Sequence, residues 1–503
     1  MPEMLSPGVY PTEVDFSAYV KALSTSTFGI AGVFEKGPVG EAILVTSLED
    51  ARRKLGGYLD ADGHFGLHAL KNFFENGGSR ARVVRVTHLD GDGNSTAVAS
   101  SVSINDRDGD GDSTANPTLK VEANTPGLWG DDLTVEVTDS AAYPSTGFNL
   151  IVKKDDGTVL ETFRDLLMDP TSVDYVERKV NGVSEYIVVT DLNSPDNMDA
   201  RPEVGNHALT GGDDGLTGLV AADYVRALAH FDPVDVNFIA VPGETDVTIL
   251  EGLVTYVEGR KDCIAILEVP PDEDVSGMVD FRKGTGSYTH SAFNSSYAAL
   301  YGPWVVADHP VTGREITLPP AGFVAGIYAR NDAEGNVWTA PAGLNRGTLR
   351  GAKRPAIAIS KGDMDILYPE GINPLAQVAG AFVVNGQRTL QLKASATDRV
   401  NIRRLLVYVE KAVSDAAQFL VFEPNNKATW EAFKRLVNPF LQRIKDGGGF
   451  YDFLTVCDET INTPAVIDAN EMRARVMVKP TKTAEFINIE FAIAPTGADF
   501  SEL

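Results

Sequence analysis

The spacing of apolar residues between 402 and 445 predicts two amphipathic helices. In the first helix, apolar residues recur at intervals of three and four, which places them on one face; they are Ile402, Leu405, Leu406, Val409, Ala412, Val413, Ala416 and Leu420. The second helix, over 427–445, carries Trp430, Phe433, Val437, Phe440, Leu441 and Ile444 on one side. Asn426 is suited to cap its N-terminus, Pro439 should kink it, and three glycines at 447–449 should end it.

Two strands are predicted to close the chain after these helices. The segment ARVMVK alternates weakly between apolar and polar residues. In FINIEFAI, residues 486–493, Ile487, Ile489, Phe491 and Ile493 share one face, while Asn488 and Glu490 share the other. A strand of this kind presents an unpaired edge unless another strand covers it.

Helices and apolar strands alternate in residues 26–90 and again from 216 to about 310. Strand-like runs such as TFGIAGVF, VNFIAVPG and CIAILEVP lie between stretches with helical periodicity, near 48–55, 64–76, 219–230 and 247–260. Buried strands that alternate with helices are typical of a parallel sheet. We therefore expect an α/β core.

Residues 91–215 have a different pattern from the core. Short alternating strands, including LTVEVT and EYIVVT, are separated by loops rich in Asp, Gly, Ser and Asn, which indicates an inserted all-β domain. Residues 1–25 contain Pro7, Gly8 and Pro11 and few apolar side chains, so they should form an extended arm.

The expected fold class is mixed α/β and α+β in several domains. A central parallel α/β core, an inserted all-β domain, and C-terminal helices with a β-hairpin follow the extended N-terminal arm. The predicted boundaries are 1–25 for the arm, 26–90 and 216–370 for the α/β parts, 91–215 for the insertion, and 371–503 for the C-terminal domain.

Charge excludes one class of function. The 503 residues include 44 Lys and Arg against 70 Asp and Glu, a net charge of −26. Residues 90–215 alone hold 25 acidic and 8 basic residues. Direct binding of nucleic acid requires a basic surface to neutralise phosphates, so no such binding is expected.

The cellular setting also follows from the sequence. The N-terminus has no apolar signal-peptide core, and no apolar run approaches the ~20 residues that span a bilayer, so we expect folding in the cytoplasm and no membrane insertion. Cys263 and Cys457 each lie in an apolar stretch, which favours buried thiols over a disulfide between subunits.

No motif in the chain supports catalysis. The run DRDGDGDS spaces Asp106, Asp108, Asp110 and Asp112 like a calcium loop, but the twelfth position, which needs Glu, is Pro117; a solvated acidic loop is therefore the preferred interpretation. His64 and His68 are four residues apart but lack the adjacent Glu of a zinc-protease motif, so they are interpreted as ordinary helix residues.

Other catalytic signatures are missing as well. GTGSYT at 284–289 has two of the three glycines of a dinucleotide loop and no preceding strand, and the chain contains no GxSxG or Walker motif. The expectation is a protein that is not an enzyme and holds no cofactor.

Motifs spread along the chain resemble the contractile tail sheath family of bacteriophages and related injection systems. The N-terminal ones are SPGVYPTEVD at 6–15, STFGIAGVFEKGP at 26–38 and FFENGGSRARVVRV at 73–86. A more specific central motif reads LPPAGFVAGIYARND at 318–332, followed by VWTAPAG at 337–343, where Gly343 departs from the usual Asn. The C-terminal ones are NGQRTL, VNIRRLLVYVEKAV, FEPNNKATW, TVCDETINTP and KPTKTAEFINIEF, between 385 and 491. The resemblance does not extend to 91–215.

The resemblance implies a structural subunit that polymerises as stacked six-fold rings around a tail tube and contracts to drive the tube through the host envelope for genome ejection. Its partners would be further copies of itself, the tail tube, the baseplate and the tail terminator, and it would reside in the virion tail after assembly in the host cytoplasm. Strand exchange between subunits would use the arm and the last strand, with Ser6, Pro7, Gly8, Val9, Tyr10, Val14, Phe486, Ile487, Ile489, Phe491 and Ile493 as the candidate residues.

The second C-terminal helix offers a candidate face for the tube. Its basic residues, which stand out in an acidic chain, are Lys427, Lys434, Arg435, Arg443 and Lys445. A solvated helix face explains them equally well. Three other interpretations of the chain stay open: the sheath of an injection or secretion apparatus, a non-contractile virion assembly protein, and an α/β enzyme with a β insertion.

Overall fold

The computed structural model describes residues 24–60, 63–107, 116–192 and 200–486. They divide into two compact units. The core unit comprises Leu23–Val337 and Pro341–Tyr408. Of the described residues, the C-terminal unit holds Trp338–Ala340 and everything from Val409 onward. The predicted FINIEFAI strand, beyond Phe486, and the arm through residue 23 lie outside the described residues.

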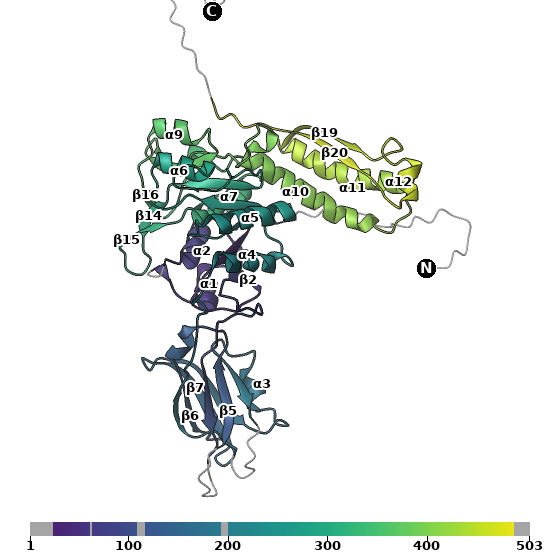
Figure 1. The fold of residues 1–503 in the computed structure, drawn as a ribbon. Coiled ribbons are helices and arrows are strands. Elements are labelled where there is room, and N and C mark those ends of the chain that lie inside the picture. Colours follow the sequence, from purple (N-terminus) through teal and green to yellow (C-terminus); the bar gives the residue numbers. More distant parts are fainter. Residues whose placement is uncertain (1–23, 61–62, 108–115, 193–199, 487–503) are drawn as a thin grey trace, which may run out of the picture. The chain divides into compact units, whose positions relative to one another are not determined.

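An eight-stranded sheet forms the centre of the core unit (Figure 1). Its central pairs are all parallel, and an antiparallel strand closes each edge. In spatial order the strands are β18 (Ala381–Val384), β17 (Ile372–Val378), β13 (Ala298–Gly302), β12 (Ile264–Glu268), β11 (Phe238–Ala240), β1 (Thr27–Gly32), β3 (Arg80–Arg85) and β2 (Ala42–Val45).

Side chains alternate between two cores on opposite faces of this sheet. In β12, Ile264 and Ile266 enter one core, and Ala265 and Leu267 enter the other. Strands buried on both faces lack polar alternation, which explains their continuous apolar sequence. The first core is completed by α1 (Leu48–Leu55), α2 (Gly66–Glu75) and α7 (Ala321–Glu334), and the second by α4 (Ala221–Ala227), α5 (Val247–Arg260), α6 (Val275–Lys283) and α9 (Lys361–Leu367).

Helix α7 is buried on all sides from Ala321 to Asn331. It packs closely on α2, because a Cβ atom at Gly322 would lie 2.4 Å from the Ala69 carbonyl oxygen and one at Gly326 would lie 2.7 Å from that of Phe73. Two glycines one turn apart therefore let the helix backbones approach. The predicted motif AGFVAGIYARND forms this helix, whose uniform hydrophobicity had given no periodic signal.

A small antiparallel sheet is formed by strands that precede and follow α7 in the chain. Its order is β15 (Glu315–Leu318), β14 (Val305–Asp308) and β16 (Ala352–Pro355). The short helix α8 (Gly343–Arg346) precedes β16. The turn between β14 and β15 carries His309, which becomes important below.

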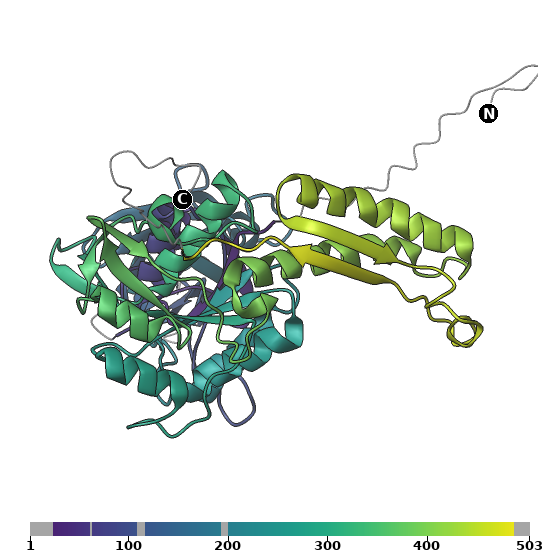
Figure 2. The ribbon, with the colours of Figure 1, turned by 90° about the horizontal axis from the view of Figure 1, so that it is seen from above.

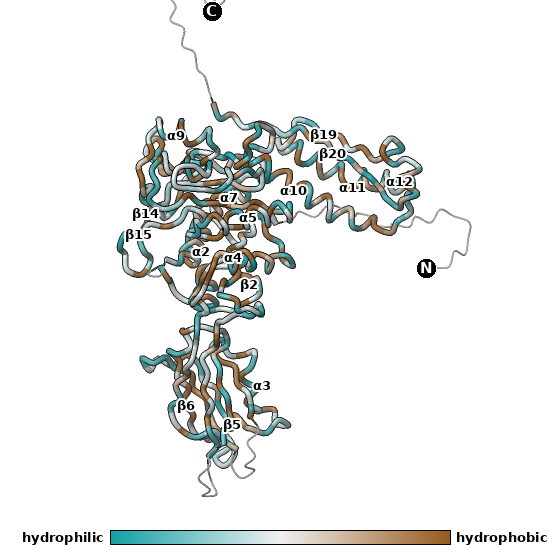
Figure 3. Tube along the Cα trace, viewed as in Figure 1, coloured by the Kyte–Doolittle hydropathy of each residue, from teal (hydrophilic) through white to brown (hydrophobic). Residues whose placement is uncertain are grey.

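The inserted segment contains two antiparallel sheets around a third core. In β6, Leu133, Val135 and Val137 point into that core while the residues between them are partly exposed, and Figure 3 shows this alternation along the strands. The four-stranded sheet is β10 (Gly205–Ala208), β6 (Leu133–Asp139), β7 (Gly147–Lys154) and β8 (Val159–Leu167); the three-stranded sheet is β4 (Ser101–Asn105), β5 (Pro117–Ala123) and β9 (Ile187–Asp191), with α3 (Val176–Val180) beside it.

The C-terminal unit is built on two long helices and a two-stranded sheet (Figure 2). Helix α10 (Val400–Ala417) begins in the core unit and continues past Tyr408 into the C-terminal unit. The Asn426 side chain accepts hydrogen bonds from the Ala428 and Thr429 amides and caps α11 (Lys427–Asp446), as predicted. Strand β19 (Phe450–Val456) packs on α11 and pairs antiparallel with β20 (Arg475–Pro480); α12 (Pro464–Asp468) lies between them in sequence.

The mixed α/β class is confirmed, and the predicted C-terminal helices agree with α10 and α11 within a few residues. The unit boundary differs from the expected one at 370/371. Because β17 and β18 belong to the central sheet, the compact core extends to Tyr408, inside α10. Both cysteines are buried free thiols, as expected.

Candidate functional site: assembly surfaces and buried polar clusters

The β19–β20 sheet leaves backbone edges available for further strands. Among the described residues it holds only these two strands, so each has one edge without a strand partner. Its outer face is apolar at the centre, where Leu454 and Met477 lie opposite one another and are 56% and 42% exposed. Two isolated strands are marginal in water. This sheet is therefore a surface onto which strands from elsewhere can add.

The predicted exchange residues fall mostly outside the described residues. Phe486 is described, and its side chain is 82% exposed. The other ten, in the arm and at 487–493, are outside, so their role stays a prediction. Phe486 lies six residues after β20, at the end of the described chain.

The basic residues of α11 separate into two groups. Lys427, Lys434 and Lys445 form ion pairs with Glu459, Glu431 and Asp452, respectively, at 2.5–2.8 Å. Arg435 and Arg443 are exposed and have no ion-pair partner among the described residues. The sequence could not separate these groups, because Glu459 and Asp452 come from outside the helix. Only the two arginines remain as unneutralised cations on this face.

An apolar turn follows α10. Phe419, Val421 and Phe422 are exposed by 74%, 60% and 103%. Phe422 also has a φ of 72°, a left-handed conformation that a bulky side chain rarely adopts. Periodicity had placed Leu420 on the buried face of the first helix, whereas α10 ends at Ala417 and Leu420 is only partly buried.

A buried carboxylate lies at the carboxyl end of β12, the edge of a parallel sheet where α/β enzymes place their active sites. Glu268 is 2% exposed, and burial raises its pKa to about 8. Its Oε1 accepts a hydrogen bond from the Ala321 amide at 2.6 Å, and its Oε2 accepts one from the Gly243 amide at 2.8 Å. Because one oxygen accepts from the amide at the start of α7 and the other from an amide just after β11, this carboxyl group links these two elements and has a structural role.

Asp60, His68 and His309 form a cluster that the sequence did not reveal. The Asp60 Oδ1 atom lies 3.4 Å from His68 Nε2 and 3.2 Å from His309 Nε2. His68 lies on α2, where its ring packs on Tyr58, and it is 1% exposed, so burial lowers its pKa to about 4. His309 is 241 residues away in the β14–β15 turn, and no local pattern links the two.

The hydrogen bonds of this cluster do not fit a metal site. His309 Nδ1 accepts hydrogen bonds from the Val311 and Thr312 amides at 3.1 and 3.0 Å, so in the neutral ring the proton is on Nε2, the atom that faces Asp60. Among the described residues, which omit 61 and 62, the buried Nδ1 of His68 has no hydrogen-bond partner, whereas a ligating histidine normally donates that N–H to an acceptor. The cluster is best described as one carboxylate that contacts the Nε2 atoms of two histidines.

The calcium hypothesis cannot be carried further in this structure. Asp106 is buried, and its Oδ1 accepts a hydrogen bond from the Asn116 amide at 3.2 Å. Asp108, Asp110 and Asp112 lie outside the described residues, so the four carboxylates stay a sequence-level candidate.

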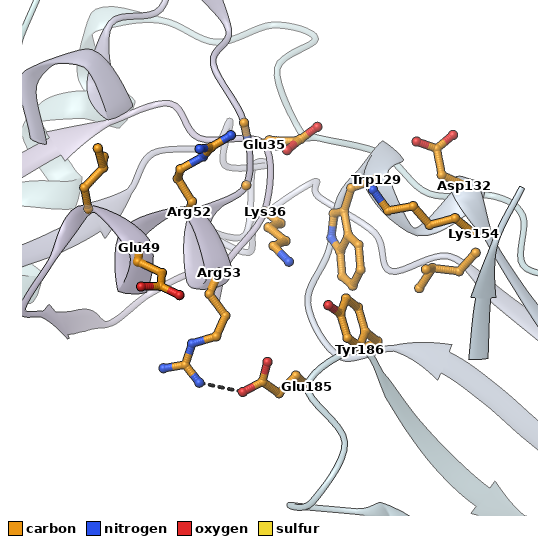
Figure 4. Close-up of a pocket in the computed structure, with 14 residues that line it drawn as sticks. Glu35, Lys36, Glu49, Arg52, Arg53, Trp129, Asp132, Lys154, Glu185 and Tyr186 are labelled. Carbon is orange, nitrogen blue, oxygen red and sulfur yellow. Dashed lines mark hydrogen bonds and ion pairs between the residues drawn. The ribbon is translucent and has the colours of Figure 1, made fainter. Parts of the chain in front are cut away.

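A groove of about 840 Å³ lies between α1 and the inserted segment (Figure 4). The Lys36 ammonium sits 4.9 Å from the ring centre of Trp129 and 5.4 Å from that of Tyr186, and Arg53 pairs with Glu185 across the groove. Burial lowers the pKa of Lys36. The lining mixes cations and anions and includes no nucleophile–base pair, so its contacts tie the insertion to the core.

Buried Arg85 reinforces the same junction. Its guanidinium donates hydrogen bonds to the carbonyl oxygens of Gly37 at 3.0 Å and Pro126 at 2.6 Å, and it lies 3.6 Å from Asp214. One side chain thus contacts the turn at Gly37, the loop at Pro126 in the inserted segment, and the stretch around Asp214 that leads from the insertion back to the core.

No described helix is long and apolar enough to cross a membrane.

Comparison with protein families identifies two consecutive domains. Residues 217–390 match the phage tail sheath protein central domain, and residues 393–494 match the phage tail sheath C-terminal domain, together more than half of the chain. The chain is 33% identical to the tail sheath protein of Vibrio phage KVP40 over 328 residues, and 33% identical to that of Enterobacteria phage T4 over 343 residues. These alignments cover 60% and 64% of this chain but 49% and 51% of the relatives, so the chain spans about half the length of the curated relatives it matches.

Solved structures agree at the level of the fold. The sheath tail protein of Listeria innocua superposes with a TM-score of 0.62 at 14% identity, covering 92% of this chain and 96% of that one. The contracted sheath complex of an extracellular contractile injection system superposes with a TM-score of 0.58 at 18% identity over the full length of both chains. The matched domains, the curated relatives and the shared fold together show that the chain belongs to the contractile tail sheath family.

Proposed function

We propose that this chain is the structural subunit of a contractile tail sheath, which polymerises around a tail tube and shortens. The observation that carries the proposal is the two-stranded β19–β20 sheet with open edges, in a chain that belongs to the sheath family. An open edge is a liability for a protein that remains monomeric and an asset for one that assembles by strand addition.

Assembly follows from the open edges. The arm (1–25) of one copy and the last strand (486–493) of another add to the β19–β20 sheet of a third, and backbone hydrogen bonds provide the contact. Because donor and acceptor surfaces differ, the contact is head-to-tail and generates a helical array of stacked six-fold rings. The remaining partners are the tail tube, the baseplate and the tail terminator, and assembly takes place in the host cytoplasm.

Contraction is a switch between two packings of the same lattice. The extended form is metastable, and strand links keep neighbouring subunits connected while the core units repack. A gain of ~1–3 kcal/mol per subunit, an ordinary coupling energy, sums over many subunits to the work of driving the tube through the host envelope. The protein needs no cofactor and catalyses no reaction in this scheme.

The exposed face of α11 is the proposed contact with the tube. Arg435 and Arg443 are its unneutralised cations, and Lys427, Lys434 and Lys445 keep intramolecular carboxylate partners that an acidic tube surface would have to replace. Arginine suits such a contact because its planar fork binds carboxylates with two hydrogen bonds. The inserted segment, 91–215, forms the outer decoration of the sheath in this proposal.

The sheath of an injection apparatus is the second candidate. Among the structural neighbours are baseplate and sheath complexes of the anti-feeding prophage, with TM-scores of 0.57 and 0.58, respectively. The curated relatives are phage proteins with higher identity, which favours a virion tail. Purification of native particles separates the two: a phage tail carries a DNA-filled head, and an injection particle does not.

Negative-stain electron microscopy of the chain expressed alone tests the proposal. We expect hollow cylinders with helical striations, because a subunit with its own donor strands and open acceptor edge needs no other protein to polymerise. A variant that lacks residues 1–23 and everything after Phe486 keeps the described residues but has neither donor segment, and it should stay monomeric. Cylinders formed equally well by both would contradict strand addition.

A further inference from the structure

A buried ion pair lies at the point where the described chain begins. Arg404 on α10 and Asp332 near the end of α7 are joined at 2.6 Å between Nη2 and Oδ2, and both side chains are 4% exposed. The same Nη2 donates a hydrogen bond to the Thr25 carbonyl oxygen at 3.2 Å. Thr25 is the last residue of the expected arm (1–25) and precedes β1 by two residues.

The surroundings hold the guanidinium in place. Its carbon lies 4.7 Å from the ring centre of Tyr328 and 5.6 Å from that of Phe238, so two aromatic faces flank the cation. The neighbouring Arg403 stacks on Tyr297 at 4.2 Å and donates a hydrogen bond to Ser296 at 2.7 Å. Two consecutive arginines therefore fix the first turns of α10 in the core unit.

The ion pair uses only part of its hydrogen-bonding capacity. Nη1 of Arg404 and Oδ1 of Asp332 are buried and have no hydrogen-bond partner in the part of the chain that the structure describes. An arginine–carboxylate pair can form two parallel hydrogen bonds. If Thr25 withdraws, Arg404 loses the Thr25 carbonyl and Asp332 loses the Thr25 side chain, while the 2.6 Å bond between Arg404 and Asp332 keeps the two charges paired.

We propose that Arg404 is a positioning residue that anchors the root of the N-terminal segment to helix α10, through a joint with Asp332 that can open at Thr25 without leaving a charge unpaired. The proposal rests on the proposed function, in which residues 1–25 are the exchange arm.

Limited trypsin digestion of the full, unassembled chain tests the anchor. Cleavage after Lys21 requires several flanking residues, up to about Thr25, to enter the protease in an extended form. The cleavage rate therefore rises with the fraction of molecules in which the hydrogen bond between Arg404 and Thr25 is broken. Arg404→Met removes the bond to Thr25, and Asp332→Asn in the same chain prevents an unpaired buried carboxylate. We expect cleavage after Lys21 to be at least about fivefold faster in this double variant, since a hydrogen bond to a charged group is lost.

The controls separate release of the root from general loosening. Arg404→Lys keeps a cation that can donate to Thr25, and it should recover most of the protection. Arg354→Met breaks an exposed ion pair with Glu315 and should leave the rate unchanged. Cleavage after Lys21 must accelerate relative to cleavage at other sites in the same digest, identified by mass spectrometry.

A rate in the double variant equal to that of the wild type, or acceleration at all sites alike, overturns the anchor. The digestion uses the monomer, so it reads the joint whether or not the chain forms cylinders. Cylinder formation by the wild-type chain tests the proposed function separately.

Discussion

Replacing Glu268 by glutamine tests whether this buried carboxyl group of the core unit, whose pKa is raised to about 8, has a structural role. The Glu268 side chain is 2% exposed and accepts hydrogen bonds from the Gly243 and Ala321 amides. Glutamine has nearly the same shape but offers one acceptor oxygen instead of two, so its NH₂ group must face one of those two amide donors. One buried N–H is then left without an acceptor.

The magnitude has two parts of opposite sign. The lost hydrogen bond costs about 1–3 kcal/mol at any pH. Burial raises the pKa of Glu268 from 4.5 to about 8, so the folded state holds a proton that the unfolded state releases above pH 4.5. Stability from this group is therefore fully present below pH 4.5 and is lost as the pH rises through 8; at ~1.4 kcal/mol per pH unit, the loss is at most about 5 kcal/mol.

Together, the two parts predict that the order of stability of the wild type and the variant reverses as the pH rises. Near pH 5 the wild type should be more stable than the Glu268→Gln variant by about 1–3 kcal/mol. Above pH 8 the variant should be the more stable chain, because glutamine carries no charge to bury. Urea unfolding of the core transition at several pH values measures the difference, and subtraction of the two chains cancels the other titrating groups.

A matched substitution provides the control. Glu49→Gln changes an exposed carboxylate on α1, and its effect on the free energy of unfolding should be small. A constant difference between wild type and Glu268→Gln from pH 5 to 9 would refute the assignment of a raised pKa to this carboxylate. Loss of cylinder formation without loss of stability would show that Glu268 has a role beyond the architecture.

Three further predictions address other features. Burial lowers the pKa of His68 from 6.5 to about 4. As the pH falls from 6.5 to 4, the wild type should therefore lose up to about 3 kcal/mol of unfolding free energy relative to His68→Phe, measured by urea unfolding. The same pH dependence in both chains would exclude this linkage. Arg435→Glu with Arg443→Glu should weaken co-assembly with the tube protein in a sedimentation assay while the melting temperature stays within a few degrees; unchanged assembly would exclude the basic face of α11 as the contact. Replacing 91–215 by a short glycine-rich linker should leave cylinder formation in electron micrographs intact; failure of a folded variant to polymerise would show that the insertion belongs to the lattice.

The local patterns of the sequence predicted much of the secondary structure. Helices α5 and α11 were located within a residue or so of their observed ends. For α11 the reason is plain, because Asn426 and the glycines at 447–449 mark its ends and periodicity marks its buried face. Helix α7 was not predicted from periodicity. It is buried on every side, and a helix without a polar face has no period to detect.

Long-range contacts were beyond the reach of sequence patterns. His68 was interpreted as an ordinary helix residue, yet it shares Asp60 with His309 from a distant turn. The basic residues of α11 were treated as one set, although three of them are neutralised, two by residues outside the helix. Strands β17 and β18 were assigned to a C-terminal domain because proximity in sequence does not reveal which sheet a strand joins.

A helical cryo-electron microscopy reconstruction of cylinders formed by the purified chain tests the central claim most directly. The account predicts that the β19–β20 sheet gains strands from two other copies, one from an arm and one from residues 486–493, so that every subunit is linked through shared sheets. A lattice in which the β19–β20 sheet remains two-stranded, or in which the added strands belong to the same subunit as that sheet, would contradict strand exchange as the basis of the assembly.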